Sequence, residues 1–341
     1  MPETAIAQVF LGPERGFDRR EIPIPKLGPG EVLVAISLAS ICGSDLHTLA
    51  GRREAPVPCV LGHEAVGHIA AMGAGRTDLS IGQRVTWSLA DSCGHCPACV
   101  TYDLPQKCDA LFKYGHAAID DGSGLNGCYA SHIVLRPGTA IFPVPARLPD
   151  AAVVPANCSL ATMVNVLEAI PTNARSVLVQ GAGLLGLHAC ALLRHRGVTE
   201  IFCRDADSGR QSAALKFGAI VGEPNQVDAV IEVVGDPSVV AQGIDLLRPG
   251  GTYALVGMVH PQSVLNLTGE TIIKKCLRIV GVHNYAPRHL RDGLRFLKDT
   301  SDLFDFAGLV SPPMPLGELP AAIALANTRR WPRVSINPRQ F

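Results

Sequence analysis

The segment "ICGSDLH" at residues 41–47 brings four chemically different side chains together. They are the thiol of Cys42, the hydroxyl of Ser44, the carboxylate of Asp45 and the imidazole of His47. A turn needs none of these groups, although short polar clusters are common in loops. The segment is therefore either an ordinary polar loop or one part of a reactive site.

The segment "LGHEAVGH" follows soon after and contributes His63 and Glu64. A thiolate and an imidazole are both zinc ligands, and a mixed Cys/His site with an open position is typical of catalytic zinc. Such a site needs a third ligand, for which Cys158 in "PANCSLAT" is the candidate. Without that ligand, His63 and Glu64 are better interpreted as a surface pair.

Four cysteines cluster in "CGHCPACVTYDLPQKC", at Cys93, Cys96, Cys99 and Cys108. Four thiolates from one loop match a tetrahedral zinc site, which is structural because no position remains for a substrate. The alternative is a loop without metal or one that is oxidised. His95 lies within the loop and is expected to be solvated.

A glycine-rich segment, "GAGLLG", follows the apolar run "SVLVQ" and opens a helical pattern. Gly181 permits a tight turn, Gly183 lets backbone amides approach a pyrophosphate, and Gly186 lets helix and strand pack closely. Leu184 and Leu185 begin the helix, whose positive end would hold the phosphates. The segment predicts a dinucleotide site, and the alternative is a similar fold with an empty glycine turn.

An acidic residue at the end of the next predicted strand bears on the choice of dinucleotide. Asp205 ends "EIFCRD", nineteen residues after Gly186, and would accept hydrogen bonds from both hydroxyls of the adenosine ribose. A carboxylate repels a 2′-phosphate, which favours NAD over NADP. Arg204 and Arg210 weaken that preference, and Arg210 is also a candidate cofactor contact.

The bulk composition fits a folded protein with no net charge. Among the 341 residues, 18% are charged and 47% are apolar, and 30 basic residues balance 30 acidic ones. This balance argues against a nucleic-acid partner. The sequence shows neither a signal segment nor a membrane span, which predicts a cytoplasmic protein. Five isolated cysteines are expected to be small buried residues: Cys59, Cys128, Cys190, Cys203 and Cys276.

The chain has two parts with different sequence patterns. The first 150 or so residues are rich in Gly and Pro and contain short β-branched runs such as "EVLVAI", typical of strands joined by irregular loops. From about Ala174, apolar strands alternate with amphipathic helices, which predicts a parallel sheet covered by helices. After about His283 the elements are too short for a separate core, so this segment is expected to pack on the first domain.

Together these motifs resemble those of the zinc-containing medium-chain alcohol dehydrogenases, and the likeness covers nearly the whole chain. The motifs occur in the family's order, from "CGSDLH" and "GHE" through the four-cysteine lobe to the junction cysteine and the glycine loop. The resemblance implies an α/β protein with a GroES-like β-rich catalytic domain and a Rossmann domain with a doubly wound parallel sheet. The expected ranges are 1–160 for the catalytic domain, with a zinc lobe at about 91–116, 161–283 for the NAD-binding domain, and 284–341 for the return segment.

The resemblance also implies a catalytic zinc, in addition to the structural one in the lobe. Its ligands would be Cys42, His63 and Cys158, with Glu64 as an inner or alternating ligand. Asp45 would orient the ring of His63 through its other nitrogen. The implied cofactors are therefore two zinc ions per chain and NAD.

A proton relay is implied as well. Ser44 would hydrogen-bond the substrate oxygen, His47 would pass its proton on to solvent, and Thr162 would lie beside the nicotinamide. The implied reaction interconverts a primary or secondary alcohol and an aldehyde or ketone, with hydride transfer to or from NAD. A homodimer or homotetramer is expected, paired through an edge strand for which "CLRIVGVH" (276–283) is the candidate.

The substrate stays open at this point. The stretch "LPQKCDALFKYGH" resembles a subgroup associated with phosphonate catabolism, in which Lys113, Tyr114 and His116 would offer donors to a small anionic substrate such as a hydroxyphosphonate. The alternative is that "FKYGH" only packs the lobe. A polyol is another candidate substrate. A non-catalytic NAD-binding or redox-sensing protein would have lost ligand or relay residues, and a zinc-independent enone reductase would lack both cysteine clusters.

Three departures from the family pattern give further expectations. The gap "VTYDLPQK" is one residue longer than usual, so the loop should bulge or Cys108 should be displaced. Only "IVGEPNQV" stands where relatives have a further strand and helix, so the parallel sheet should be trimmed at one edge. Gly43 occupies the position of a phosphate-binding arginine in some relatives, which removes that contact.

Overall fold

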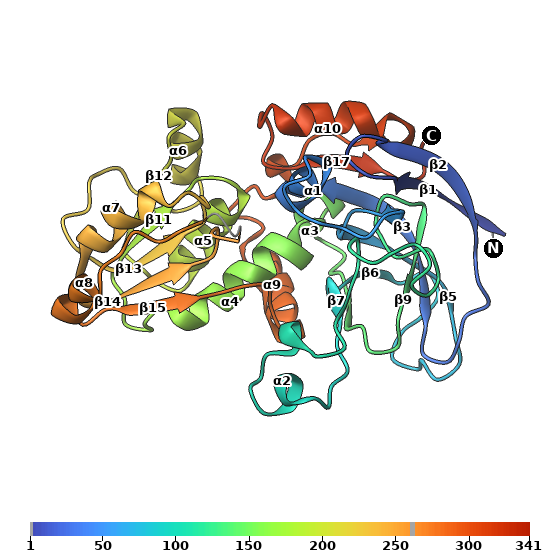
Figure 1. Cartoon of the computed structure of the whole chain (residues 1–341), viewed down its shortest axis with the longest axis horizontal. Coiled ribbons are helices and arrows are strands. Elements are labelled where there is room, and N and C mark those ends of the chain that lie inside the picture. Colours follow the sequence, from blue (N-terminus) through green and yellow to red (C-terminus); the bar gives the residue numbers. More distant parts are fainter. Residues whose placement is uncertain (1–2, 260–262) are drawn as a thin grey trace. The chain divides into compact units, whose positions relative to one another are not determined.

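The structure, a computed structural model, describes residues 3–259 and 263–341 (Figure 1). The chain forms two compact units. The first unit comprises residues 1–158, 286–301 and 305–341, and the second comprises residues 159–285 and 302–304.

Antiparallel strands make up most of the first unit. Its largest sheet has seven strands in the order β10-β6-β5-β3-β17-β16, with β9 also paired to β3. The central strand β3 is apolar along nearly its whole length and is mostly buried, as expected for a strand covered on both faces. The strands of this sheet are β3 (Val32–Ile41), β5 (Glu64–Met72), β6 (Arg84–Trp87), β9 (His132–Leu135), β10 (Ile141–Pro143), β16 (Met314–Pro315) and β17 (Val334–Asn337). A smaller sheet contains β1 (Thr4–Phe10), β2 (Phe17–Pro23) and β4 (Cys59–Val60).

The C-terminal segment completes this unit. Strand β17 pairs antiparallel with β3, so that Val334 lies opposite Ile41. Helix α10 (Leu319–Asn327) buries Leu319 and Ala322 in the core that also contains Trp87. Helix α9 (Pro287–Thr300) belongs to the same unit. The first unit therefore needs both ends of the chain.

The segment that follows β3 is a helix, so its interpretation as a polar loop is wrong. Helix α1 (Gly43–Leu49) begins directly after Cys42, whose backbone is extended at the N-cap position. The Asp45 carboxylate accepts a hydrogen bond from the Cys42 backbone N–H at 2.9 Å. An acid three residues after the N-cap stabilises a helix start in this way. That spacing is the signal in the sequence that predicts the helix.

The four cysteines lie in a lobe closed by a two-stranded ladder. Strand β7 (Ala90–Asp91) pairs with β8 (Phe112–Lys113), and helix α2 (Pro97–Val100) lies between them in sequence. Asp103, in the long gap before Cys108, adopts a left-handed conformation with φ 52°. This backbone conformation is uncommon for a residue other than glycine and marks a turn inside the lengthened gap.

A continuous helical stretch follows the β-rich part of the chain. It consists of α3 (Asp150–Val153), a π-helical segment at Ala156–Leu160 and α4 (Ala161–Ala169). By length and composition, Asp150–Ala169 is apolar enough to cross a membrane, but 67% of its most apolar window is buried inside the protein, as in a core helix. Irregular π-helical turns are frequent at functional sites, and this one contains Cys158.

The second unit is a five-stranded parallel sheet in the order β12-β11-β13-β14-β15. Its strands are β11 (Ser176–Gln180), β12 (Glu200–Arg204), β13 (Val227–Glu232), β14 (Leu247–Leu255) and β15 (Arg278–Gly281), and its remaining helices are α5 (Leu184–His195), α6 (Ser208–Leu215), α7 (Ser238–Leu246) and α8 (Gly269–Lys275). Strand β12 is an outer strand, and residues 219–226 form no helix or strand before β13. The sheet is thus trimmed at that edge, as the short linker predicts.

One prediction about isolated cysteines is wrong. Cys59, Cys128, Cys190 and Cys203 are buried, but Cys276 is exposed. It follows helix α8 as its C-cap in a left-handed conformation with φ 51°. The residue ends a surface helix, directly after Lys274 and Lys275.

Candidate zinc centres and cofactor loop

Four of the predicted ligands meet in the first unit. Cys42 lies at the end of β3, His63 and Glu64 lie at the start of β5, and Cys158 comes from the π-helical segment. One ligand atom from each residue lies within 4.8 Å of the corresponding atom of every other one. We call this group the first centre.

The spacing of the first centre fits a zinc ion. The two sulfur atoms, Cys42 Sγ and Cys158 Sγ, are 3.9 Å apart. Two thiolates bound tetrahedrally at about 2.3 Å from one zinc ion would be about 3.8 Å apart. Two thiolates and one imidazole are three ligands, which leave the fourth position of a tetrahedral zinc ion for a substrate or, in its absence, for the Glu64 carboxylate.

The buried ring of His63 is held from two sides. Its Nδ1 lies 3.5 Å from Asp45 Oδ1, which leaves Nε2 as the nitrogen for a metal. Asp45 Oδ2 accepts a further hydrogen bond from the Tyr129 hydroxyl at 3.0 Å. Burial opposes the charged form of His63, but Asp45 and Cys42 outweigh it and raise the pKa of the imidazole to about 10. On the other side, the ring of His116 lies 5.2 Å away, centroid to centroid.

Glu64 has a partner that the sequence does not reveal. Its carboxylate accepts two hydrogen bonds from Arg333 Nε, at 2.8 and 3.1 Å, and one from Nη2 at 3.0 Å. It also accepts one from the hydroxyl of Ser40. Both groups are buried, and Glu64 together with Cys42 raises the pKa of Arg333 against the effect of burial. Glu64 is thus close enough to be a ligand and is also held by an ion pair.

The pKa values of the two thiols of the first centre are shifted in opposite directions. The hydrogen bond to Cys158 lowers the pKa of Cys42 most, burial opposes it, and Arg333 and His63 lower the pKa further. The same hydrogen bond and burial raise the pKa of Cys158. Arg333 Nη2 lies 3.5 Å from Cys42 Sγ. The surroundings of Cys42 therefore favour its thiolate form, which is the form that binds a metal.

The predicted relay residues lie on helix α1. Ser44 and His47 are three positions apart, so their side chains share one face of the helix. Both are half-buried. Asp45 is buried, so it lies on the side of α1 that faces the protein core.

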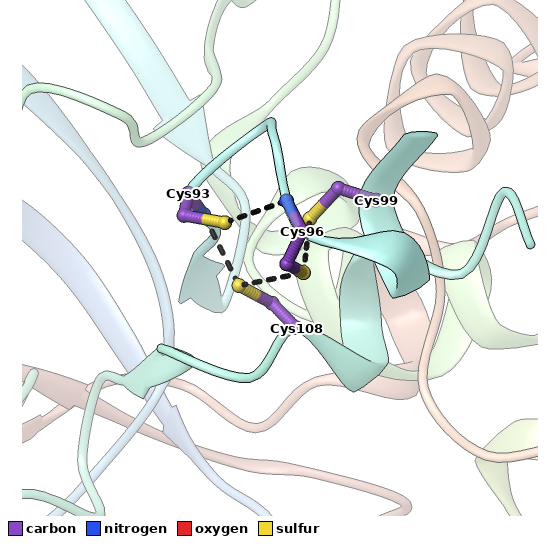
Figure 2. Close-up of side chains that lie close together, drawn as sticks. All are labelled: Cys93, Cys96, Cys99 and Cys108. Atoms are coloured by element: carbon purple, nitrogen blue, oxygen red, sulfur yellow. Dashed lines mark hydrogen bonds between the residues drawn. The ribbon is translucent and has the colours of Figure 1, made fainter. Parts of the chain in front are cut away.

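The lobe cysteines form the second centre (Figure 2). All four sulfur atoms lie within 4.8 Å of one another, including Cys108 after the lengthened gap. Cys96 Sγ is 3.5 Å from Cys99 Sγ and 3.9 Å from Cys108 Sγ. The Asp109 backbone N–H and the neighbouring thiols lower the pKa of Cys96 to about 6. His95 is exposed and points Nδ1 at the Cys93 carbonyl oxygen, at 2.8 Å. The donor set and the spacing fit a tetrahedral zinc ion.

Replacing Cys96 by Ala should remove zinc from the lobe alone. We expect the loss of about one zinc ion per chain, because a closed four-thiolate site loses its geometry with one ligand. Amide hydrogen exchange in residues 93–108 should rise, while the first centre keeps its metal. His95→Ala is the matched control, since it changes the same loop without touching a sulfur atom. Equal zinc loss in both variants would contradict the assignment.

The glycine loop of the second unit joins β11 to α5. Gly181 has φ +106°, in the left-handed region that favours glycine. A side chain on Gly186 would collide with the Gly181 carbonyl oxygen, whereas one on Gly183 would meet open space. Leu184 and Leu185 are the first residues of the twelve-residue helix α5, whose first N–H groups lack partners within the helix. The loop therefore fits the approach of a phosphate group.

Asp205 follows β12 directly and already has several partners. Its Oδ2 accepts a hydrogen bond from the Ala182 N–H of the glycine loop at 2.8 Å. Its Oδ1 accepts one from Arg210 Nη2 at 2.6 Å and one from the Asp207 N–H at 2.9 Å. Although burial opposes ionisation, these hydrogen bonds lower the pKa of Asp205. Arg210 is thus tied to the carboxylate, and Thr162 lies in α4 of the same unit.

Lys113, Tyr114 and His116 follow the lobe, and they differ in whether their polar groups already have hydrogen-bond partners. Tyr114 is fully buried, and its hydroxyl is shared with Thr139 Oγ1 at 2.6 Å and the Arg136 N–H at 2.8 Å. His116 Nδ1 lies 2.8 Å from the Tyr114 carbonyl oxygen, so it carries the ring proton. Tyr114 therefore packs the lobe and is not free to bind a substrate. Lys113 is half-buried and is not held in this network.

Comparison with known proteins identifies the class of protein. Residues 28–146 match the family described as alcohol dehydrogenase GroES-like domain, and residues 185–299 match the family described as zinc-binding dehydrogenase. An L-threonine 3-dehydrogenase of Thermococcus kodakarensis is 30% identical over 311 residues, which is 85% of each chain. The corresponding enzyme of Pyrococcus furiosus is 28% identical over 312 residues, with the same coverage.

Solved structures agree with this classification. An alcohol dehydrogenase from Thermotoga maritima has a TM-score of 0.91 and 26% identity, covering 98% of this chain and 99% of that one. An alcohol dehydrogenase from Thermus sp. ATN1 has a TM-score of 0.84 and 28% identity, covering 97% and 99%. This chain belongs to the zinc-containing medium-chain dehydrogenases. The predicted α/β combination of GroES-like and Rossmann-type domains is confirmed.

Proposed function

We propose that this protein oxidises a primary or secondary alcohol at the first centre, with NAD as the hydride acceptor. The observation that carries the proposal is the convergence of Cys42, His63 and Cys158 beside a helix bearing Ser44 and His47. When bound, zinc supplies a Lewis acid that favours the deprotonated hydroxyl, and NAD supplies the acceptor.

The chain's own residues position the groups and move the proton. Ser44 accepts the proton of the substrate hydroxyl and releases its own proton, which His47, on the same face of α1, passes toward solvent. Asp45 fixes the ring of His63, and Arg333 holds Glu64. These contacts keep the ligand set ordered. The protein would act in the cytoplasm.

The comparisons support oxidation of a hydroxyl group without deciding which one. The relatives and structures named above are threonine and alcohol dehydrogenases, so they give no particular support to a hydroxyphosphonate. L-Threonine is itself a secondary alcohol, and it is the second candidate substrate. A non-catalytic NAD-binding protein is disfavoured because the ligand and relay residues are all present.

Turnover on a panel of alcohols tests the proposal. Zinc-loaded protein should reduce NAD with at least one of ethanol, 2-butanol, sorbitol, L-threonine or 2-hydroxyethylphosphonate. Ser44→Ala should lower kcat by about 100-fold or more, since general acid–base steps contribute about that much. No turnover with any of these alcohols, or an unchanged kcat in Ser44→Ala, would contradict it.

The carboxylate of Asp205 should set the cofactor preference. In Asp205→Ser, the 2′-phosphate of NADP is no longer repelled and Arg210 is released from its ion pair. We expect the ratio of kcat/KM with NAD to that with NADP to fall by at least about tenfold, which corresponds to about 1.4 kcal/mol. Asp207→Ser is the control, because Ser preserves the N-cap that Asp207 gives α6. An equal change in both variants would contradict the role of Asp205.

We further propose that the protein forms a homodimer or homotetramer through β15, the outer strand next to β14. Its free edge offers backbone groups to a second copy. Light scattering at micromolar concentration should give a mass of at least two chains. A monomer would contradict this proposal.

A further inference from the structure

The residues on both sides of Cys158 are polar and buried. Asn157 is 0% exposed and Ser159 is 1% exposed, and both lie with Cys158 in the π-helical segment at Ala156–Leu160. A buried amide or hydroxyl costs free energy unless it is hydrogen-bonded. Both side chains are hydrogen-bonded, and each bond leads to a different part of the chain. Cys158 is therefore held through its two neighbours.

Asn157 ties Cys158 to another ligand of the first centre. Its Nδ2 donates a hydrogen bond to the backbone carbonyl oxygen of His63 at 3.0 Å, across 94 positions of the sequence. Both residues belong to the first unit. The residue before one ligand is thus fixed to the backbone of another, and this bond involves no residue of the second unit.

Ser159 ties the other side of Cys158 to the helix that follows the glycine loop. Its hydroxyl lies 3.0 Å from Nδ1 of His188 in α5, and both residues are buried. The neighbours of His188 in that helix, Leu187 and Ala189, are buried apolar residues. A buried imidazole in such surroundings needs a hydrogen-bond partner, and Ser159 provides one. Both residues lie in the second unit, which begins at Ser159.

Helix α5 cannot move independently of the glycine loop. A side chain on Gly186 would collide with the Gly181 carbonyl oxygen, so the first turn of the helix packs directly on the loop. His188 is four residues after Leu184, one turn into the helix. A phosphate held by the first N–H groups of α5 would stabilise this turn and thereby the position of His188. The glycine loop is thus connected to Cys158 through α5 and Ser159.

We propose that Ser159 and His188 are positioning residues that couple the binding of a dinucleotide in the glycine loop to the retention of zinc by Cys158. A phosphate that restricts the motion of α5 also restricts Ser159 and the adjoining ligand. Restriction by one ligand lowers the entropy cost of binding the other, which makes the two bindings cooperative. This role rests on the zinc and the dinucleotide of the proposed function, but not on turnover.

Transfer of zinc to a coloured chelator, with and without ADP-ribose, provides the test. ADP-ribose carries the pyrophosphate but no nicotinamide, so it cannot shield the metal with that ring. The phase of zinc release that Cys42→Ala lacks belongs to the first centre. Saturating ADP-ribose should slow this phase at least about fivefold in the parent protein, which is the lower end of typical couplings between two sites. In Ser159→Ala, ADP-ribose should still bind but the slowing should be lost.

Further variants separate positioning from a general loss of stability. Ser159→Thr keeps the hydroxyl and His188→Asn keeps a polar atom near the place of Nδ1, so both should retain the slowing. His188→Leu removes the partner of Ser159 and should lose it. Asn157→Leu removes the hydrogen bond within the first unit, so zinc release should be faster with and without ADP-ribose while the ratio of the two rates is unchanged.

Each contrary outcome has a separate meaning. The coupling is overturned if ADP-ribose does not bind in calorimetry, or binds without slowing zinc release from the parent protein. Equal slowing in the parent protein, Ser159→Ala and His188→Leu would also overturn it. If no alcohol is turned over but the slowing depends on Ser159, the proposed function fails and the coupling stands. If alcohols are oxidised and zinc release does not respond to ADP-ribose, only the coupling fails.

Discussion

Replacing Cys42 by Ala is expected to abolish alcohol oxidation and to remove one of about two zinc ions per chain. The variant leaves His63 and Cys158 as ligands, because Glu64 is held by Arg333. Two ligands bind zinc far more weakly than three. We expect kcat/KM to fall at least about 1000-fold, since the Lewis acid is lost. Initial rates and elemental analysis of the same preparation measure both effects.

A second buried cysteine serves as the control for this variant. Cys59 is fully buried in β4 of the same unit, and its sulfur is outside the first centre. Cys59→Ala removes the same atom and should retain both zinc ions and measurable turnover. If Cys42→Ala keeps its zinc and its activity, the first centre is not the reactive site.

Removing Arg333 should cause the largest loss of stability. Arg333→Met leaves the Glu64 carboxylate buried without its counter-ion, and breaking a buried pair in this way costs about 3–5 kcal/mol of unfolding free energy. Burial already raises the pKa of Glu64, and Arg333 opposes that rise. In the variant, Glu64 should therefore bind a proton more readily when folded than when unfolded. The loss of stability should consequently be larger at pH 8 than at pH 6.

Urea unfolding followed by tryptophan fluorescence measures this effect. Both tryptophans, Trp87 and Trp331, belong to the first unit, so the signal reports on the unit that contains the pair. The double variant Glu64→Gln/Arg333→Met removes both charges and should recover much of the loss. Arg330→Met, at an exposed neighbour, should change stability by no more than about 0.5 kcal/mol. Single and double variants of equal stability would contradict the ion-pair explanation.

The features predicted best from the sequence are those determined by short spacings. The lobe cysteines lie within sixteen consecutive residues, and the glycine loop lies between one strand and one helix. In both cases the local chain already brings the functional groups together. The spacing of Cys42 and Asp45 also contains the signal for helix α1, which the alternative of a polar loop does not take into account.

The features that escaped prediction depend on distant parts of the chain. Arg333 reaches Glu64 across 269 positions because β17 pairs with β3 next to the first centre. No spacing rule connects two such residues. Tyr114, predicted as a possible donor, is occupied by partners that the sequence does not place beside it.

Zinc K-edge X-ray absorption, combined with elemental analysis of the purified protein, tests the presence of two zinc centres most directly. We expect about two zinc ions per chain, with an average of about three sulfur ligands per zinc, because the lobe supplies four thiolates and the first centre supplies two. About one zinc ion per chain with four sulfur ligands would show that the first centre binds no metal, and would contradict the account.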